Sequence, residues 1–391
     1  MKNFLATLKN RTPLGWLQLK HNKTRLLTAI AGITFADILI FMQLGFQDAL
    51  YKTNTQYPRL LQTDIVLVSS QARNFNSLFT FPQRRLLQAM DIPGVKSADE
   101  LYIASVEWRN PQTREKTSLL AIGQNPDQPA LNLPAINQQL DAVKMPNTLL
   151  FDKAARGDYQ EVISQVEEGK PVTTEIARRT VTIAGLFELG ASFGDDGAVV
   201  TSEENFLRLV PKRQPGTVSI GLINVESGYE SEEVRAMLNE YLPEDVQAFT
   251  HEEYVDFELN YLQNNSAIGF VFTLGSAMGF IVGIVIVYQI LSTDVNDHLP
   301  EYATFKAMGY ENSYLLGVVF EEAIILSLVG FLPSVLVSLG LYSLTASATS
   351  MAITMPMARV ILVFILTIFM CNISGAIATR KLQAADPADM F

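Results

Sequence analysis

Residues 298–309 read HLPEYATFKAMG, and the apolar run YENSYLLGVVFEEAIILSLVGF follows at once at residues 310–331. The first stretch is short and amphipathic, and another long apolar run precedes it. If both runs cross a bilayer, the stretch between them lies at the membrane edge, where a partner can push on it. The sequence therefore predicts a membrane protein in which residues 298–309 can receive force.

The composition is intermediate between that of a soluble protein and that of a fully embedded one. Of the 391 residues, 48% are hydrophobic and 18% are charged, and the mean hydropathy is +0.18. Four windows have the length of about 20 apolar residues that a helix needs to cross a bilayer. They are residues 26–46, 266–291, 313–344 and 358–379. We therefore expect an α+β membrane protein with four transmembrane helices and a large exported domain over residues 47–265.

The distribution of charge predicts the orientation in the membrane. Residues 1–25, an amphipathic lead-in, contain six basic side chains and no acidic one, whereas residues 47–264 contain 19 basic and 31 acidic side chains. The positive-inside rule places such an N-terminus in the cytoplasm. Four crossings return residues 380–391 to the same side as a cytoplasmic tail. The predicted location is the inner (plasma) membrane, with the large domain in the periplasm.

The exported region contains two β-α-β units. The first is a strand at 64–69, a helix at 82–90 and a strand at 95–108, and the second is a strand at 217–225, a helix at 231–241 and a strand at 246–250. Two such units separated by an insertion predict a ferredoxin-like split βαβ fold. The insertion, about residues 112–215, is expected to form a mostly β subdomain. Residues 251–265 predict a helical stalk that leads directly into the second span.

Three acidic residues fall inside the predicted spans, namely Asp37, Glu321 and Glu322. A carboxylate in hydrocarbon is costly and requires a partner, a position facing the helix bundle, or water. For Asp37 the sequence allows a bond to a Ser, Thr or backbone group of a neighbouring helix. It also allows a proton or substrate contact, although no basic residue lies at a matching depth in another span.

Small residues recur at intervals of four in two of the predicted spans. The second span contains Gly275, Gly279 and Gly283, and the third contains Gly330 and Ser334. Such faces let a neighbouring helix approach closely, but glycine is frequent in membrane helices in general. Neither face identifies its partner, and the helix through which a dimer would pack stays open.

Several catalytic and binding motifs do not occur in the sequence. There is no G-x-x-x-x-G-K-[ST] loop for nucleotide and no H-E-x-x-H, C-x-x-C or G-x-S-x-G motif for metal, redox or acyl-transfer chemistry. The polar region also has no basic cluster with interleaved aromatic residues, which argues against nucleic-acid binding. We therefore expect no catalytic residue, no metal site and no cofactor bound by this chain, and any energy from ATP and Mg²⁺ must come through a partner.

The loop at residues 292–312 is the most specific signal. It contains Asp294, Asp297, Glu301 and Glu311 against a single lysine, which is contrary to the positive-inside rule and suggests a protein partner. A helix from Pro300 would carry Glu301 near its positive end and would end at Gly309. Its apolar side would hold Tyr302, Phe305 and Met308. The alternative is an interfacial helix that rests on lipid.

The segment EYATFKAMG, followed by FEEA and then GF-x-P, resembles the signature of FtsX/MacB-type permeases of ABC transporters. The matching residues are Glu301, Lys306, Ala307, Gly309, Glu322 and Ala323, while Pro300 stands where the family often has a basic residue. The order of one span, a large exported domain, three spans and a tail is similar too. More narrowly, GWLQLKHNKTRLLTAIAGITFADILIFMQLGFQDALY and the ending RKLQAADPADMF resemble the DevC permeases of cyanobacteria, which are associated with export of heterocyst-type glycolipids.

The resemblance implies a non-catalytic permease subunit of a mechanotransmission-type ABC exporter. Its implied partners are a second copy of the permease, a separate ABC ATPase, a periplasmic membrane-fusion adaptor, a TolC-like outer-membrane channel and membrane lipids. The residues implied to couple to the ATPase are Glu301, Tyr302, Thr304, Phe305, Lys306, Met308 and Gly309. The implied cargo is a lipid or glycolipid.

Two other functions remain open at the level of sequence. An FtsX-like protein could use the same movement to activate a periplasmic hydrolase instead of moving cargo. A membrane enzyme or proton-coupled carrier could depend on Asp37, although no second titratable group joins it in the first span.

Overall fold

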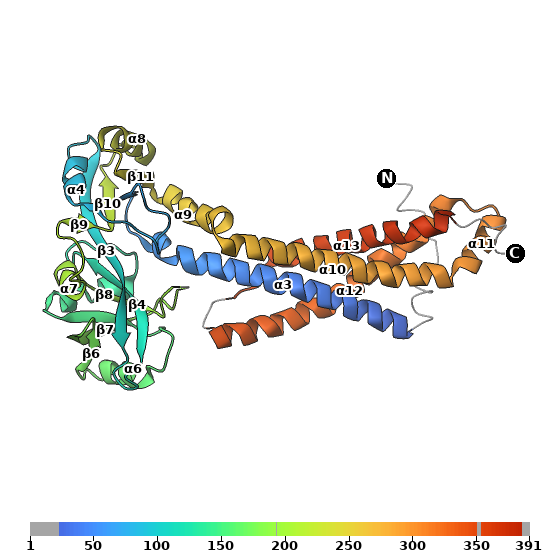
Figure 1. Cartoon of the computed structure of the whole chain (residues 1–391), viewed down its shortest axis with the longest axis horizontal. Helices are drawn as coiled ribbons and strands as arrows, with labels where there is room; N and C mark the ends of the chain where they lie inside the picture. The colour runs from blue at the N-terminus through green and yellow to red at the C-terminus, as the bar shows by residue number, and fades with distance from the viewer. Residues whose placement is uncertain (1–22, 193, 350–352, 385–391) are drawn as a thin grey trace. The chain divides into compact units, whose positions relative to one another are not determined.

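The structure is a computed structural model that describes residues 23–192, 194–349 and 353–384 (Figure 1). The chain divides into two compact units. We call Met1–Ala49 with Ala267–Phe391 the helical unit, and Leu50–Ser266 the sheet domain. The predicted amphipathic segment before residue 23 and the end of the predicted tail after residue 384 lie outside the described residues.

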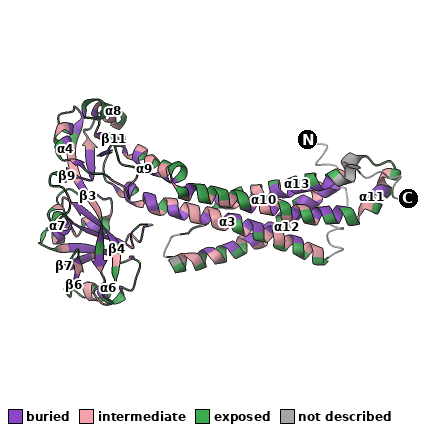
Figure 2. Ribbon diagram, in the orientation of Figure 1, coloured by how far each residue is buried: buried purple, intermediate pink, exposed green. Residues whose placement is uncertain are grey.

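Long apolar helices build the helical unit. They are α3 (Lys23–Leu60), α10 (Ala267–Asp297), α12 (Asn312–Thr349) and α13 (Met357–Ala384), with the short α11 (Leu299–Ala307) between α10 and α12. In the described part of the chain, four helices are long and apolar enough to cross a membrane. Large apolar side chains of these helices are exposed, such as Leu336 at 71% and Phe270 at 67%. Figure 2 shows exposed positions along the long helices. Outward-facing apolar side chains are what a helix in contact with lipid requires.

One half of the sheet domain, built from the two ends of its sequence, has the ferredoxin-like arrangement. Its elements are β1 (Ile65–Ser69), α4 (Arg84–Ala89), β3 (Val95–Arg109), β10 (Ile220–Val225), α8 (Ser231–Tyr241) and β11 (Val246–Thr250). The strands lie in the order β11-β1-β10-β3, and all neighbours are antiparallel. This order is the one that two split βαβ units produce, so the predicted α+β fold class is confirmed.

The insertion continues the same sheet. It contributes β4 (Lys116–Gln124), β5 (Thr148–Asp152), β6 (Val172–Ile176), β7 (Arg179–Phe187) and β8 (Ala198–Ser202), with the helices α5 (Pro134–Asn137), η1 (Leu140–Lys144), α6 (Gln160–Glu167) and α7 (Glu203–Leu209). The order runs β3-β4-β8-β5-β7-β6, and β6 pairs again with the end of β3 through Trp108 and Ile176. The long strand β3 therefore belongs both to the ferredoxin-like half and to a closed ring of strands.

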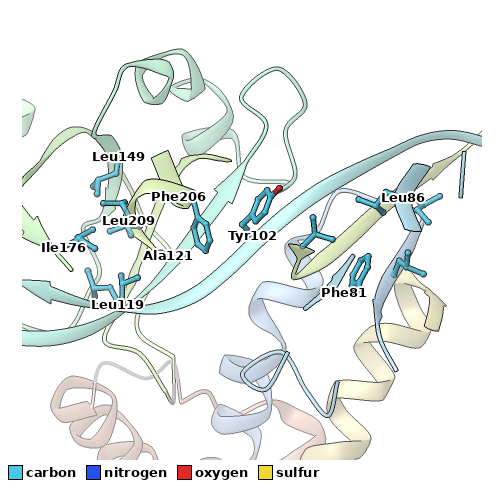
Figure 3. Close-up of a cluster of buried hydrophobic side chains, with 14 of the residues drawn as sticks. Phe81, Leu86, Tyr102, Leu119, Ala121, Leu149, Ile176, Phe206 and Leu209 are labelled. Atoms are coloured by element: carbon cyan, nitrogen blue, oxygen red, sulfur yellow. The ribbon is translucent and has the colours of Figure 1, made fainter. Parts of the chain in front are cut away.

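Both faces of the sheet are covered. On one face a continuous apolar cluster includes Phe81, Leu86, Tyr102, Leu119 and Phe206 (Figure 3). A second cluster on the other face gathers side chains from α3, α5 and α9 (His251–Asn260). Alternate residues of β1 enter different clusters, as the period of two in a strand requires.

Two details differ from the expectation based on sequence. Pro82 does not begin a helix, because it pairs with Thr217 in the short strands β2 (Phe81–Pro82) and β9 (Thr217–Val218), and α4 starts two residues later. The predicted stalk is also not one uninterrupted helix with the second span. After α9 comes a π-helical turn, η2 (Tyr261–Asn265), and Ser266 has extended backbone angles (φ −109°, ψ 147°) that end the helix before α10 begins.

Candidate functional site

The short helix α11 is defined at both ends by local sequence. Pro300 lies in its first turn, where no N–H is needed, and Glu301 lies beside the positive end of the helix. At the other end Gly309 has φ +90°, a conformation that favours glycine. The N–H of Gly309 donates to the carbonyl of Lys306 at 3.0 Å, and the N–H of Tyr310 donates to that of Phe305 at 3.1 Å. These two bonds form a Schellman motif, which stops the helix where the sequence predicts.

The inner side of α11 packs on the ends of the neighbouring helices. Tyr302 is 1% exposed and contacts Val295 of α10 and Val319 of α12. Phe305 lies against Tyr310, with ring centroids 5.6 Å apart and an edge-to-face geometry. These contacts fix the orientation of α11 relative to α10 and α12.

The opposite side of α11 is exposed. It carries Glu301, Thr304, Met308 and Tyr310, which we call the α11 outer surface. Met308 was expected beside Tyr302, but it is 61% exposed because it lies seven residues, or about two helical turns, after Glu301 and therefore faces the same side as Glu301. Lys306 is partly buried and lies between the two sides. The outer surface therefore combines a carboxylate, a hydroxyl and two large apolar side chains.

The acidic excess next to α11 is partly balanced inside the chain. Arg25, near the start of α3, donates to Asp294 Oδ1 at 2.6 Å and also pairs with Asp297. Two of the four acidic residues that suggested an external partner are thus held by an arginine 269 and 272 positions away. Glu301 remains on the outer surface of α11.

The glycines of α10 lie against α3 of the same chain. A Cβ atom on Gly275 would come within 2.2 Å of Gln43 Nε2, and one on Gly279 would lie 3.3 Å from Ile40. A Cβ atom on Gly283 would approach Ala36 to 3.0 Å and the Met370 sulfur of α13 to 2.0 Å. The glycine face therefore serves close packing within one chain.

The third span packs on α3 in the same way. A Cβ atom on Gly330 of α12 would come within 2.7 Å of Ile33, and the hydroxyl of Thr34 donates to the Gly330 carbonyl at 3.1 Å. Ser334 lies one turn later and reaches Asp37. Both small-residue faces thus contact the first span.

Asp37 is fully buried where α3, α12 and α13 meet. Thr367 Oγ1 donates to its Oδ1 at 2.8 Å, and Ser334 Oγ donates to its Oδ2 at 3.3 Å. Both hydroxyls also lie close to a carbonyl of their own helix. This geometry is that of a carboxyl group bonded to Ser and Thr of neighbouring helices.

The adjacent carboxyl groups of α12 differ in their surroundings. Glu322 is fully buried and faces Asp294, whereas Glu321 is only partly buried. Only Glu322 therefore lies in the packed junction between α10 and α12.

One polar cluster of the helical unit was missed at the level of sequence. Arg359 of α13 pairs with Asp48 of α3 at 2.7 Å, donates to the Thr354 carbonyl at 2.7 Å and lies over the ring of Tyr342 of α12. It is only 8% exposed. An arginine at the first turn of the fourth span was the available signal.

Among the described residues, no group of three or more His, Cys, Asp or Glu side chains could hold a metal ion. Cys371 is buried in the helical unit. The α11 outer surface is exposed in the described part of the chain.

Comparison with known proteins finds one family match. Residues 273–387 match the model described as FtsX-like permease C-terminal. This range includes most of α10, all of α11 and α12, and α13. No curated protein matches the chain.

Three solved structures with partial similarity to about half of the chain were also found. The periplasmic region of MacB from Actinobacillus actinomycetemcomitans is 9% identical over 50% of this chain and 91% of its own, with a TM-score of 0.33. The extracellular domain of the noncanonic ABC-type transporter YknZ from Gram-positive bacteria is 14% identical over 48% of this chain and 100% of its own, with a TM-score of 0.30. A domain of a putative permease protein from Porphyromonas gingivalis is 13% identical over 49% of this chain and 88% of its own, with a TM-score of 0.29.

Proposed function

We propose that this chain, whose residues 273–387 match the C-terminal domain of FtsX-like permeases, is the membrane permease subunit of an ABC exporter. In this proposal a separate ATPase subunit docks on the α11 outer surface. ATP and Mg²⁺ are bound by that subunit, and the permease performs no covalent chemistry.

The observation that carries the proposal is the combination of a fixed helix with an exposed outer surface. Tyr302 and the Schellman motif hold α11 in place, while Met308 and Tyr310 stay 61% and 46% exposed. Exposed large apolar side chains beside a charged one are typical of an interaction site. A helix that is fixed to two transmembrane helices passes a push to them.

The packing suggests a route for such a push. From α11 it reaches α10 directly, and α10 contacts α3 through the close approaches at Gly275, Gly279 and Gly283. The helix α3 runs without interruption from the helical unit into the sheet domain, where it ends at Leu60. By contrast, the helical conformation between α9 and α10 is interrupted at Ser266, which has extended backbone angles. We therefore place the mechanical connection in α3, and not in the stalk predicted at residues 251–265.

The finer assignments belong to the same proposal. The permease would be a homodimer in the inner membrane with both termini cytoplasmic, and it would act with a periplasmic adaptor and a TolC-like channel. The basic N-terminal residues and the acidic sheet domain support this orientation. The resemblance of the two ends of the chain to DevC permeases supports a lipid or glycolipid cargo.

One change of charge and one change of backbone at α11 test the docking of the ATPase. Glu301→Lys reverses the exposed charge, and Gly309→Pro removes the N–H of the Schellman motif and excludes φ +90°. Both variants should lose the co-purifying ATPase and the stimulated ATP hydrolysis. The matched control is Glu232→Lys in the exposed first turn of α8, which should keep both.

Normal ATPase binding and coupling in both α11 variants would contradict the proposal. The same purification distinguishes export from signal transmission. An adaptor and an outer-membrane channel among the bound proteins support export, whereas a periplasmic hydrolase in their place supports an FtsX-like activator.

A further inference from the structure

Glu322 of α12 is a buried carboxyl group that lacks a hydrogen-bond donor. It is 0% exposed, and neither of its oxygen atoms has a hydrogen-bond partner among the described residues. Leaving a buried ionised carboxylate without any bond costs several kcal/mol or more. Such a group requires a further species that satisfies it.

The group that faces Glu322 is Asp294 of α10. Asp294 is 2% exposed and lies within hydrogen-bonding reach of the Glu322 carboxyl. Its Oδ1 accepts from Arg25 at 2.6 Å, but its Oδ2 has no hydrogen-bond partner in the described part of the chain. The Nδ1 atom of His298 is 3.6 Å from Oδ2 and lies closer, at 3.0 Å, to the Asp294 carbonyl. The histidine therefore does not provide the missing bond.

A water molecule could donate to both carboxyl groups but would leave their negative charges in place, so the species that can offset this charge are a proton and a metal cation. A cation requires several oxygen ligands, and no metal-binding group of three or more acidic, His or Cys residues occurs among the described residues. The guanidinium of Arg25 on the same aspartate also repels a cation. A proton needs only the two oxygen atoms, and two close carboxyl groups commonly share one.

The charged groups around the pair are consistent with one bound proton. Arg25 comes from α3, Asp297 from α10 and Glu321 from α12, and His298 lies at the start of α11. Arg25 is bonded to both Asp294 and Asp297. Its single positive charge is therefore shared among Asp294, Asp297 and Glu322, and a bound proton reduces the negative charge that remains.

We propose that Asp294 and Glu322 bind one proton between them and that the resulting hydrogen bond joins α10 to α12 one helical turn before α11. The bond is short-range and buried, so it holds the two helices in one register at the place where α11 branches from α10. The proton site does not depend on the proposed transport function. An effect of this hydrogen bond on ATPase coupling would rest on that function.

Infrared spectroscopy of the full chain in lipid vesicles observes this proton directly. A protonated carboxyl group has a C=O band that is separate from the carboxylate bands and shifts in heavy water. At neutral pH the difference spectrum between the unsubstituted chain and Glu322→Gln should contain this band. Glu321→Gln, the adjacent residue, is the matched control and should give no such difference.

Thermal unfolding separates the proton from other roles of the pair. The amide of Glu322→Gln can donate to Asp294 as the shared proton does, so this variant should keep the unfolding midpoint, whereas Glu322→Ala should lower it.

Asp294→Asn offers a second route to the same infrared difference if Glu322→Gln does not fold. An unchanged infrared spectrum in both Glu322→Gln and Asp294→Asn would overturn the proposal. A stabilisation by added Na⁺, K⁺ or Mg²⁺ that disappears in Glu322→Gln would overturn it in favour of a cation. None of these readouts involves an ATPase, so their failure is distinct from failure of the proposed function.

Discussion

Asp37 is a polar residue in the interior of the helical unit. Its two oxygen atoms accept from Thr367 of α13 and Ser334 of α12, and the residue itself belongs to α3. One carboxyl group thus contacts three helices in the interior of the helical unit. A pumping role would need a second titratable group or a water path, whereas a structural role needs only the bonds observed.

Substitution of Asp37 separates these roles. In Asp37→Asn the side-chain oxygen can still accept from one hydroxyl, so we expect assembly and coupled ATP hydrolysis to be retained. Asp37→Leu loses both bonds and should lower the free energy of unfolding by roughly 1–3 kcal/mol. Thermal unfolding in detergent and ATPase assays measure the two effects. Loss of activity in Asp37→Asn with normal assembly would support a proton-coupled carrier and contradict the structural role.

Glu258 of α9 is a second buried carboxyl group, and it lies in the sheet domain. It is 2% exposed and neighbours Tyr254 and the backbone of Phe75. Burial raises its pKa from 4.5 to about 7, and the neighbouring Phe75 backbone and Tyr254 side chain offset only part of this shift. The folded protein therefore keeps a proton on Glu258 at pH values where the unfolded chain has lost it.

The stability of the sheet domain should consequently depend on pH. Between about pH 4.5 and 7 the folded state binds more protons than the unfolded state, so the free energy of unfolding falls as pH rises through this window. The total change is on the order of 3 kcal/mol. Glu258→Gln should remove this part of the dependence in denaturant unfolding of the full chain. Parallel pH profiles for the two proteins would show that the carboxyl group is ionised in the folded state.

At the scale of elements, α3 packs closely against α10 and α12. The glycines of α10 and Gly330 of α12 all face it, and the gaps they leave are too small for a Cβ atom without movement of a neighbour. Membrane helices gain stability from such close approach because lipid provides no hydrophobic driving force between them. The small residues therefore fix the distance between α3 and its neighbours.

Enlarging one of these glycines should separate the helices. Gly283→Ile places a side chain where Met370 and Ala36 already lie, and we expect a loss of roughly 1–3 kcal/mol in stability together with weaker coupling. Gly340→Ala on α12 is the matched control, because nothing lies within 4 Å of its Cβ position. Thermal unfolding of both variants tests the point. Equal stability of Gly283→Ile and the unsubstituted chain would show that the α3–α10 contact is not tight.

At the scale of the whole molecule, the elements that depend on short segments of sequence were predicted, whereas the contacts between distant segments were not. The four apolar runs predicted four long helices, and two β-α-β patterns predicted the ferredoxin-like order, because both signals are contained in short segments. The second pairing of β3, with β6, was not predictable, since it joins Trp108 to Ile176 far along the chain. The strands β5 and β6 were missed for the same reason.

The candidate site follows the same division. The start and end of α11 were predicted from Pro300 and Gly309, which act through the local backbone. Met308 was assigned to the wrong side, although its spacing of seven residues from Glu301 is itself a local signal. The pairing of Arg25 with Asp294, by contrast, depends on contact between distant helices. Sequence alone therefore located the surface but could not show which of its acidic neighbours are paired inside the chain.

The central claim is that a separate ATPase docks on the α11 outer surface, and cross-linking from Thr304 measures this most directly. A photo-reactive amino acid at Thr304, which is exposed on α11, should capture in native membranes a protein that contains a Walker-type nucleotide-binding loop. The same amino acid at Glu232 on the exposed surface of α8 should not capture it. Capture of the ATPase from Glu232, or only of lipid from Thr304, would contradict the account.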